Sequence, residues 1–241
     1  MRANRRRAVL ATLAALVLAP ALGWAAYAAA TWLTFGRAGA STEVGAGSDP
    51  LMRRYMSRYD IAEVHQTRVV APASATYDAA RAVDLYQSGV VHAIFRSREI
   101  MLGSTPEARP KNFPLVAELL SIGWGVLEEV PGRQIVLGSV TQPWQSNVVF
   151  RALPPSAYAS WDSAGFVKIV VTVAADSLGP CQSVFRTETW AVATDAASRA
   201  KFRRYWSVFS PGILLIRTQA LSLVRRDAEG RARGDACGGG R

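Results

Sequence analysis

Arg186 and Glu188 form the arrangement in this sequence that is best suited to orient a ligand. They lie two residues apart in the β-prone stretch FRTETWAVA, and residues two apart on a strand project from the same face. If that face lines a cavity, Glu188 is the polar group best placed to position a small molecule. The alternative, which we favour, is a structural ion pair at the edge of a sheet, because structural networks also perturb carboxylates.

Histidine and cysteine give little support for catalysis or metal binding. His65 and His92 lie on different predicted elements, and no serine or cysteine occurs in a nucleophile motif such as GxSxG, so no catalytic residue is assigned. Cys181 and Cys237 lack a CxxC spacing and a nearby histidine, which argues against a zinc site. An oxidising compartment would allow one disulfide between them, but the Gly- and Arg-rich tail around Cys237 gives no reason for the sulfurs to be held together. We therefore predict no metal and no cofactor.

Tryptophan is frequent in the second half of the chain. Five of these residues are Trp124, Trp144, Trp161, Trp190 and Trp206. Core packing explains most of them, although small-molecule sites are also lined by aromatic and apolar side chains with a few polar groups. Trp190 and Trp206 are the best candidates for a pocket wall, because they lie on the strand and the helix that would enclose it. The predicted ligand-binding residues are Trp190, Glu188, Trp206, Trp144 and Phe202.

These residues lie in or near one stretch, residues 185–217, that combines a strand with a helix. Residues 185–193 are rich in Thr, Trp, Val and Phe and predict a strand, and Thr194 and Asp195 supply a helix N-cap after it. Apolar residues then recur at steps of three or four, at Phe202, Trp206, Phe209, Ile213, Ile216, Ala220 and Val224. This face extends over about six turns and must cover a large surface, which we expect to be an antiparallel sheet.

Pro211 interrupts this pattern, because proline removes one backbone hydrogen bond and clashes with the preceding turn. Either Ser210 to Gly212 joins two helices, or one bent helix fits over a curved sheet or gates a cavity. The remaining strands are predicted at residues 61–70, 124–130, 134–140, 148–153 and 166–173, with shorter helices before residue 121. Val167 and Ile169 share one face of their strand, whereas Lys168 and Thr172 occupy the other, so one side of the sheet is expected to be packed and the other partly wet.

The N-terminal segment is typical of membrane targeting. Residues 1–7 contain four arginines and no acid, and residues 8–35 carry no charge. This run exceeds both a signal-peptide core and the roughly 20 residues of a spanning helix, which favours a retained transmembrane anchor. The alternative is a signal segment cleaved after the Ala26-Tyr27-Ala28 sequence, which would release a secreted protein. The positive-inside rule then predicts a cytoplasmic N-terminus and an extracytoplasmic C-terminal domain in the cell membrane.

The composition divides the rest of the chain into three parts. Residues 36–50 are rich in Gly, Ala and Ser and predict a flexible linker, residues 51–229 form one domain, and residues 230–241 are expected to be a disordered tail. Charged and Gly-rich composition begins after Val224.

The net charge of +10 does not indicate a nucleic-acid partner, because the arginines are scattered and no basic run alternates with aromatic residues.

Three strings in this order, PGRQIVLGSV, FRTETWAVATD and FRRYWSVFSPGILLIR, are similar to sequences of the START/Bet v 1-like superfamily, also called SRPBCC. That superfamily includes polyketide cyclase/dehydrase-like proteins and lipid-transfer domains. The resemblance covers roughly residues 60–229 and implies an α+β helix-grip fold, in which a curved antiparallel sheet wraps around a long C-terminal helix and leaves an apolar cavity. Most members lack a spanning segment, so the preceding N-terminal transmembrane helix is a departure from the pattern.

Three functions are compatible with these observations. The leading hypothesis is a membrane-tethered domain that holds a hydrophobic small molecule or lipid in an internal cavity. The second is a cyclase or dehydratase acting on a similar ligand, which would need an acid–base pair facing the same cavity. The third is a structural or interaction domain whose cavity is filled. The sequence gives no indication of the oligomeric state.

Overall fold

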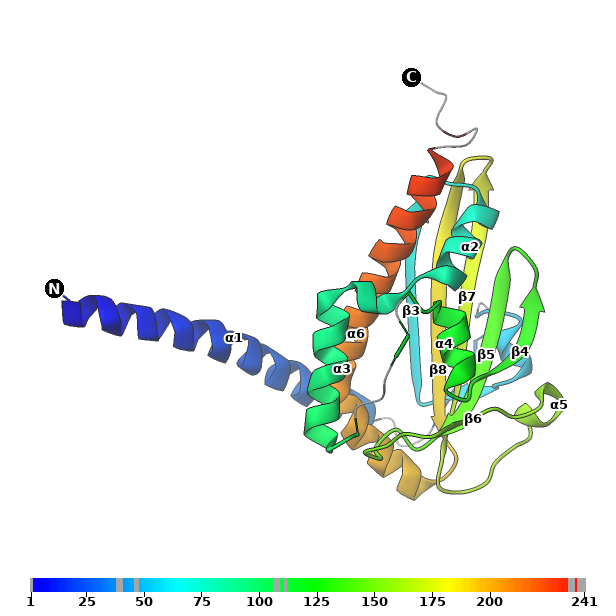
Figure 1. The fold of residues 1–241 in the computed structure, drawn as a ribbon. Helices are drawn as coiled ribbons and strands as arrows, with labels where there is room; N and C mark the ends of the chain where they lie inside the picture. The colour runs from blue at the N-terminus through cyan, green and yellow to red at the C-terminus, as the bar shows by residue number, and fades with distance from the viewer. Residues whose placement is uncertain are drawn as a thin grey trace.

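The protein is built around a six-stranded antiparallel sheet, with its longer helices on one face (Figure 1). The computed structural model describes residues 2–37, 41–45, 48–105, 109–110, 112–233 and 237. The strands of the sheet are β3 (Ile61–Val69), β4 (Gly125–Val130), β5 (Gln134–Thr141), β6 (Phe150–Arg151), β7 (Val167–Gly179) and β8 (Gln182–Ala193). The α-helices are α1 (Arg2–Arg37), α2 (Ala73–Ala82), α3 (Gly89–Leu102), α4 (Leu115–Ser121), α5 (Pro155–Tyr158) and α6 (Ala196–Ala232). Short elements are β1 (Thr42–Glu43), β2 (Arg58–Tyr59) and the 3-10 turns η1 (Met52–Arg54) and η2 (Leu85–Gln87).

The predicted α+β class is confirmed, with a curved antiparallel sheet and a long C-terminal helix (Figure 1). The strand order is β3-β8-β7-β5-β4, with β6 paired to β5. Strand β8 leads directly into α6, whose first turn is capped by Asp195, because its side chain accepts a hydrogen bond from the Ser198 amide at 2.8 Å. This connection folds α6 back across the inner face of the sheet, where Val173 and Phe185 pack near Val224.

The outer face of the sheet is covered as well, which the sequence did not predict. Every residue of β5 is buried, because η1 and α5 lie over the outer side chains of the central strands. Lys168 is buried on this face, and its ammonium group donates to the carbonyl oxygens of Ala159 and Trp161, each at 3.0 Å. The expectation of a partly wet face is therefore wrong for the central strands.

Helix α6 is continuous through Pro211, so the alternative in which residues 210–212 join two helices is wrong. Ser210, Pro211 and Gly212 are all buried. The indole nitrogen of Trp24 donates to the Val208 carbonyl oxygen at 2.9 Å, one turn before Pro211. Helix α1 therefore packs against α6 where proline disturbs the hydrogen bonds of the helix.

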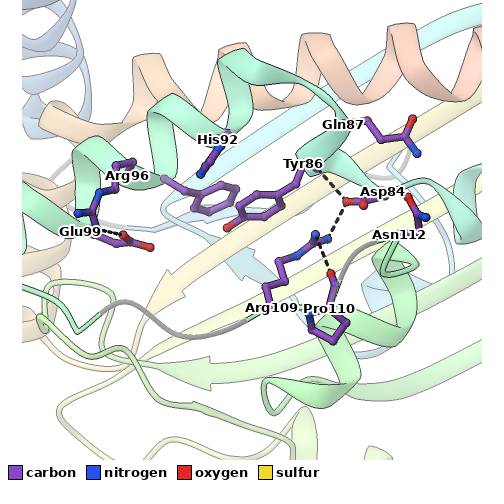
Figure 2. A pocket seen from close by; sticks show the side chains of 10 residues that line it. Asp84, Tyr86, Gln87, His92, Arg96, Glu99, Arg109, Pro110 and Asn112 are labelled. Carbon is purple, nitrogen blue, oxygen red and sulfur yellow. Dashed lines mark hydrogen bonds and ion pairs between the residues drawn. The ribbon is translucent and has the colours of Figure 1, made fainter.

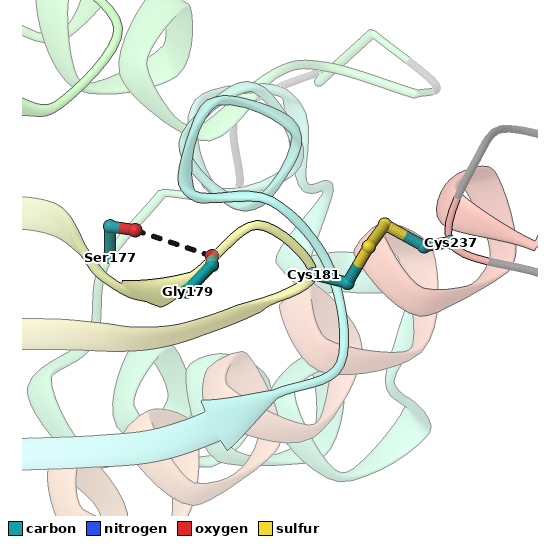
Figure 3. The surroundings of a disulfide bond; sticks show 4 residues. All are labelled: Ser177, Gly179, Cys181 and Cys237. Carbon is teal, nitrogen blue, oxygen red and sulfur yellow. Dashed lines mark hydrogen bonds between the residues drawn. A yellow bond between two sulfur atoms is a disulfide. The ribbon is translucent and has the colours of Figure 1, made fainter. Parts of the chain in front are cut away.

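The predicted linker and tail contain more structure than their composition suggests. Strand β1 pairs with β2, and Asp49 is buried, so the second half of the linker packs on the domain. Helix α6 extends to Ala232, beyond the position where disorder was expected to begin, and Cys237 forms a disulfide with Cys181 in the β7–β8 turn (Figure 3). The expectation that nothing holds these sulfurs together is wrong, because the extended helix brings the tail to that turn. Residues 38–40, 46–47, 234–236 and 238–241 of the linker and tail lie outside the described residues.

Two helices, α6 and the segment Ala14–Phe35 of α1, are long and apolar enough to cross a membrane. Helix α6 covers the sheet, whereas the N-terminal part of α1 projects away from the domain (Figure 1). The other end of α1 packs along α6. Phe35 makes an edge contact with Phe202 at 5.9 Å between ring centres, and the Arg203 guanidinium lies 3.6 Å from the centre of the Trp32 ring.

Candidate functional site

The five predicted ligand-binding residues do not surround a common space. Phe202, Trp206 and Trp144 belong to one apolar cluster between α6 and the inner face of the sheet. Trp190 lies in a different cluster, on the outer face beneath η1, and Glu188 is on that same outer face. The reason is the two-residue period of a strand, which places Trp190 opposite to its neighbours that face α6. Trp190 and Trp206 therefore cannot enclose one cavity.

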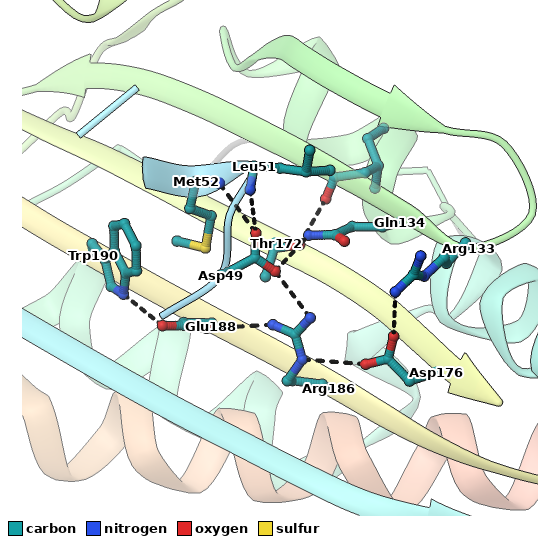
Figure 4. Close-up of polar contacts among 11 residues, drawn as sticks. Asp49, Leu51, Met52, Arg133, Gln134, Thr172, Asp176, Arg186, Glu188 and Trp190 are labelled. Atoms are coloured by element: carbon teal, nitrogen blue, oxygen red, sulfur yellow. Dashed lines mark hydrogen bonds and ion pairs between the residues drawn. The ribbon is translucent and has the colours of Figure 1, made fainter. Parts of the chain in front are cut away.

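The predicted pairing of Arg186 with Glu188 is confirmed, and it belongs to a larger structural network (Figure 4). Arg186 donates to Glu188 at 3.3 Å and to Asp49 at 2.9 Å, and the Trp190 indole donates to Glu188 at 2.7 Å. Asp49 also accepts from the Met52 amide at 3.1 Å. The network joins the segment before η1 to the outer face of the sheet, so the structural role favoured from the sequence is confirmed, but its place at an edge is wrong because β8 lies between β3 and β7.

Opposing effects act on the carboxylates of this network. Burial opposes ionisation of Asp49, but hydrogen bonds from the Met52 amide, Arg186 and Gln134 outweigh it, so the pKa of Asp49 is lowered. Burial also raises the pKa of Glu188, and here the hydrogen bonds from Trp190 and Arg186 do not compensate.

Asp49 was missed in the sequence because it falls at the end of a Gly-rich segment. Its position just before a predicted helical turn was the available signal.

A pocket with a volume of about 660 Å³ lies between α3 and the residues Arg109, Pro110 and Asn112 (Figure 2). Its size is in the range typical of small-molecule sites. It is lined by Asp84, Tyr86, Gln87, His92, Phe95, Arg96, Glu99, Arg109, Pro110 and Asn112. None of the five predicted ligand-binding residues is among them.

An aromatic pair forms one wall of this pocket. The Tyr86 and Phe95 rings stack with 5.2 Å between their centres and an angle of 7° between their planes. Local capping positions both rings. The Asp84 side chain accepts from the Tyr86 amide at 2.9 Å and caps η2, and Ser88 donates to the Gln219 side chain at 3.0 Å, which joins the start of α3 to α6.

Arg109 closes the other side of the pocket and is held on both sides by carboxylates. Its guanidinium lies 2.7 Å from Asp84 and 2.6 Å from Glu118, and its centre is 4.1 Å from the middle of the Tyr86 ring. Burial opposes ionisation of Asp84, but the hydrogen bond from Arg109 outweighs it and lowers the pKa of Asp84. Burial, with a smaller effect of Glu118, raises the pKa of Tyr86 to about 12.

Arg109 engages two acids beside the pocket, and His92 also belongs to the lining. Arg109 holds Asp84 ionised and contacts Glu118 at 2.6 Å, and Tyr86 keeps its proton at neutral pH. No group of three His, Cys, Asp or Glu residues suited to a metal occurs in the part of the chain that the structure describes. The rings of Tyr86 and Phe95 supply the aromatic part of the lining. Sequence reasoning missed this site because Asp84 and Arg109 are 25 residues apart and belong to no recognisable motif.

A band of polar residues divides the inner face of the sheet. Arg217 lies on the inward side of α6, and Glu63 and His65 face it from β3. Arg217 Nη1 and His65 Nε2 are closed to solvent and have no hydrogen-bond partner among the described residues, although a Glu63 oxygen lies 3.3 Å from His65 Nε2. Burial lowers the pKa of Arg217 to about 10, against the attraction of Glu63.

Comparison with known proteins gives distant likenesses only. No protein-family model matches the chain, and no curated protein matches it. The Zhui aromatase/cyclase from Streptomyces sp. R1128 is 14% identical over 75% of this chain and 99% of its own, with a TM-score of 0.29. The di-domain ARO/CYC BexL from the BE-7585A biosynthetic pathway is 14% identical over 70% of this chain and 46% of its own, with a TM-score of 0.26.

A third solved structure, CalU16 from Micromonospora echinospora, is 10% identical over 81% of this chain and 97% of its own. Its TM-score is 0.26. These likenesses are too distant to assign a family, a ligand or a reaction.

Proposed function

We propose that this protein is a membrane-tethered domain of helix-grip type that binds a small, largely hydrophobic organic molecule in the pocket beside α3 that Arg109 and Asn112 help to line. The observation that carries the proposal is the stacked pair of Tyr86 and Phe95, which presents an aromatic face inside a pocket of about 660 Å³. A flat ring in the ligand would pack on this face. Its polar groups would meet the polar side chains of the lining, such as Arg96 at one end and Asn112 at the other (Figure 2).

Binding is preferred to a cyclase or dehydratase reaction because of the state of the acidic groups. Such a reaction needs a side chain that can give or take a proton near neutral pH. Asp84 and Glu118 are both engaged by Arg109, and the high pKa of Tyr86 makes it a poor base. His92 also lines the pocket, so a reaction that uses its imidazole as the acid or base is the alternative function.

The proposed location is the outer surface of the cell membrane, with α1 as the anchor. The uncharged run of residues 8–35 after four arginines supports this orientation. The disulfide between Cys181 and Cys237 supports an oxidising compartment, since cytosolic thiols are kept reduced. Secretion after cleavage of α1 is the alternative, and N-terminal sequencing of the membrane and secreted fractions would separate the two.

The ligand proposal is tested first by native mass spectrometry of the full chain, purified in a mild detergent. A co-purifying small molecule supports the proposal and identifies its class. A direct test uses 2-naphthoate as the probe and the full chain in lipid nanodiscs, with binding measured by isothermal titration calorimetry and the heat from empty nanodiscs subtracted.

The variant for this test is Phe95→Ala, and Phe209→Ala is the matched control. Phe209 is also a helical phenylalanine paired with a tyrosine ring, Tyr205, at 4.8 Å, but it lies on α6 outside the pocket. Loss of one aromatic contact should weaken binding by about tenfold in Phe95→Ala, and the control should bind like the wild type. The proposal fails if 2-naphthoate binds no better than to empty nanodiscs and no ligand co-purifies, or if both variants bind equally.

A further inference from the structure

Helix α1 leaves the domain at a point where three helices meet. The Trp24 indole donates to the Val208 carbonyl oxygen of α6 at 2.9 Å. A side chain added at Gly212 would come within 3.3 Å of the Trp24 ring and 3.0 Å of the Ile94 side chain of α3. Gly212 is therefore the place where α1 and α3 both approach α6, and the lack of a side chain there allows the close contact.

The length of α1 that remains free beyond this contact is short for a membrane. Residues 8–23 are the uncharged residues between the last arginine of the N-terminal cluster and Trp24. Sixteen helical residues extend about 24 Å, at about 1.5 Å per residue, whereas the hydrocarbon core of a bilayer is about 30 Å thick. An anchor of this length keeps the surface around Trp24 at the level of the lipid headgroups.

The surface around this point is apolar, as such a position requires. Val208 and Leu215 lie one turn before and one turn after Gly212 on the same side of α6, and they are 37% and 44% exposed. Val90 and Met101 lie one and two turns from Ile94 on the same side of α3, and they are 46% and 61% exposed. We call Val90, Met101, Val208 and Leu215 the apolar patch.

We propose that the apolar patch rests on the lipid surface of the membrane that α1 crosses. This inference depends on the proposed anchoring by α1. A lipid surface is favoured over a protein partner because Val208 of the patch accepts a hydrogen bond from Trp24 of α1, and the nearby α1 side chains of Leu22 and Tyr27 are exposed. Arg204 is exposed one turn before Val208 and can reach headgroup phosphates, while tryptophan and tyrosine near residue 24 are suited to the interface.

Contact between the apolar patch and the lipid would give two sides of α3 different roles. Val90, Ile94 and Met101 face the lipid and α6, while Phe95 and Glu99 line the pocket on another side of the same helix. The pocket would therefore open beside the membrane surface. A hydrophobic ligand could then pass between the lipid and the pocket along α3 without crossing a long path through water.

The test uses the full chain reconstituted in vesicles of phosphatidylcholine and phosphatidylglycerol. A single cysteine carries a spin label in each of the variants Met101→Cys, Leu215→Cys, Leu18→Cys and Leu178→Cys. The native Cys181 and Cys237 do not react because they are joined in a disulfide. Leu18→Cys is the control for lipid, and Leu178→Cys is the control for water. Leu18 lies on the projecting part of α1, and Leu178 is 53% exposed at the β7–β8 turn.

The readout is the ratio of collision rates with oxygen, which concentrates in lipid, and with a water-soluble nickel complex. Labels at residues 101 and 215 should show a ratio severalfold above that at residue 178, and the label at residue 18 should show the highest ratio. If the label at residue 18 shows the ratio of lipid but the labels at residues 101 and 215 show the same ratio as residue 178, α1 is an anchor and the apolar patch does not contact lipid. If residue 18 also matches residue 178, the anchoring itself is wrong.

Discussion

The guanidinium of Arg109 lies 4.1 Å from the centre of the Tyr86 ring while it binds the carboxylate of Asp84 at 2.7 Å. The cation thus fixes both the aromatic wall of the pocket and the residue that caps the turn leading to it. Tyr86 in turn stacks on Phe95 of α3. The shape of the pocket depends on an ion pair network that is largely buried, and removing its centre should affect stability and binding together.

Replacing Arg109 with Met should destabilise the protein. Asp84 and Glu118 would lose their shared partner while 8% and 18% of their side-chain surfaces are exposed, so we expect a loss of about 2–3 kcal/mol in the free energy of unfolding. Arg54→Met is the matched control, since the Arg54 side chain is 61% exposed and its pair with Glu128 should contribute less than about 1 kcal/mol. Thermal melting followed by tryptophan fluorescence measures both. Equal melting temperatures for the two variants would contradict this account of the pocket.

Replacing Asp49 with Ala should release the segment before η1 from the sheet. The Asp49 side chain has no exposed surface, and its removal takes one buried acceptor from Arg186 and one from Gln134, at a cost of about 3 kcal/mol. Hydrogen exchange should quicken at the Leu51 and Met52 amides, which bond to Asp49. The control is Asp176→Ala.

Asp176 contacts the same arginine from a position that is 34% exposed, so its loss should cost less than about 1 kcal/mol. If Asp49→Ala leaves exchange at residues 51 and 52 unchanged, Asp49 does not hold the segment.

Reduction of the disulfide between Cys181 and Cys237 should lower stability. The bridge closes a loop of 56 residues, and the loss of this constraint on the unfolded chain corresponds to about 4 kcal/mol in the chain-entropy model. The Cys237→Ser variant should melt at a lower temperature than the wild type, and reductant should lower the melting temperature of the wild type alone. A wild-type protein that reacts with a thiol reagent without reductant would show that the bridge is not formed.

Strand periodicity predicted which residues of β8 share a face, but not which face meets α6. Arg186 and Glu188 were correctly paired, yet both faces of β8 are buried, so the pattern of hydrophobic residues could not distinguish the inner from the outer side. The long apolar face of α6 could be predicted because its apolar residues repeat over many turns. Its last turns were missed, because Ala228 and Ala232 are small residues in a charged segment and are buried all the same.

The pocket could not be predicted because its parts are distant in sequence. Tyr86 and Phe95 were part of helical patterns, but nothing in the sequence indicated that Arg109 would return to Asp84. Ion pairs between segments depend on the tertiary fold and leave no local signal. The same limit explains why Asp49 was assigned to a linker, since the side chains of Gln134 and Arg186 that donate to it lie on strands β5 and β8.

Replacing Arg217 with Met should raise the stability of the protein. Arg217 Nη1 is closed to solvent without a hydrogen-bond partner among the described residues, so an apolar side chain of similar length removes a desolvation cost, by about 1–3 kcal/mol. Arg225→Met is the matched control on the same helix. Its side chain is 55% exposed and pairs with Glu229, so the change should stay within about 0.5 kcal/mol.

The same variant gives a pH test through His65. Burial and the charge of Arg217 lower the pKa of His65, against the attraction of Glu63, so the folded protein holds this imidazole neutral. In the unfolded chain the pKa of His65 is about 6.5, and in the folded protein it is lower. The associated stability is therefore present above a pH of about 6.5 and is lost as the pH falls from there through the folded-state pKa. In Arg217→Met the pKa of His65, measured by NMR titration, should rise and the acid-induced loss of stability should shrink. The opposite result would be a lower melting temperature for Arg217→Met and an unchanged pKa of His65. It would show that the Arg217 cation has a partner in solution and stabilises the folded protein.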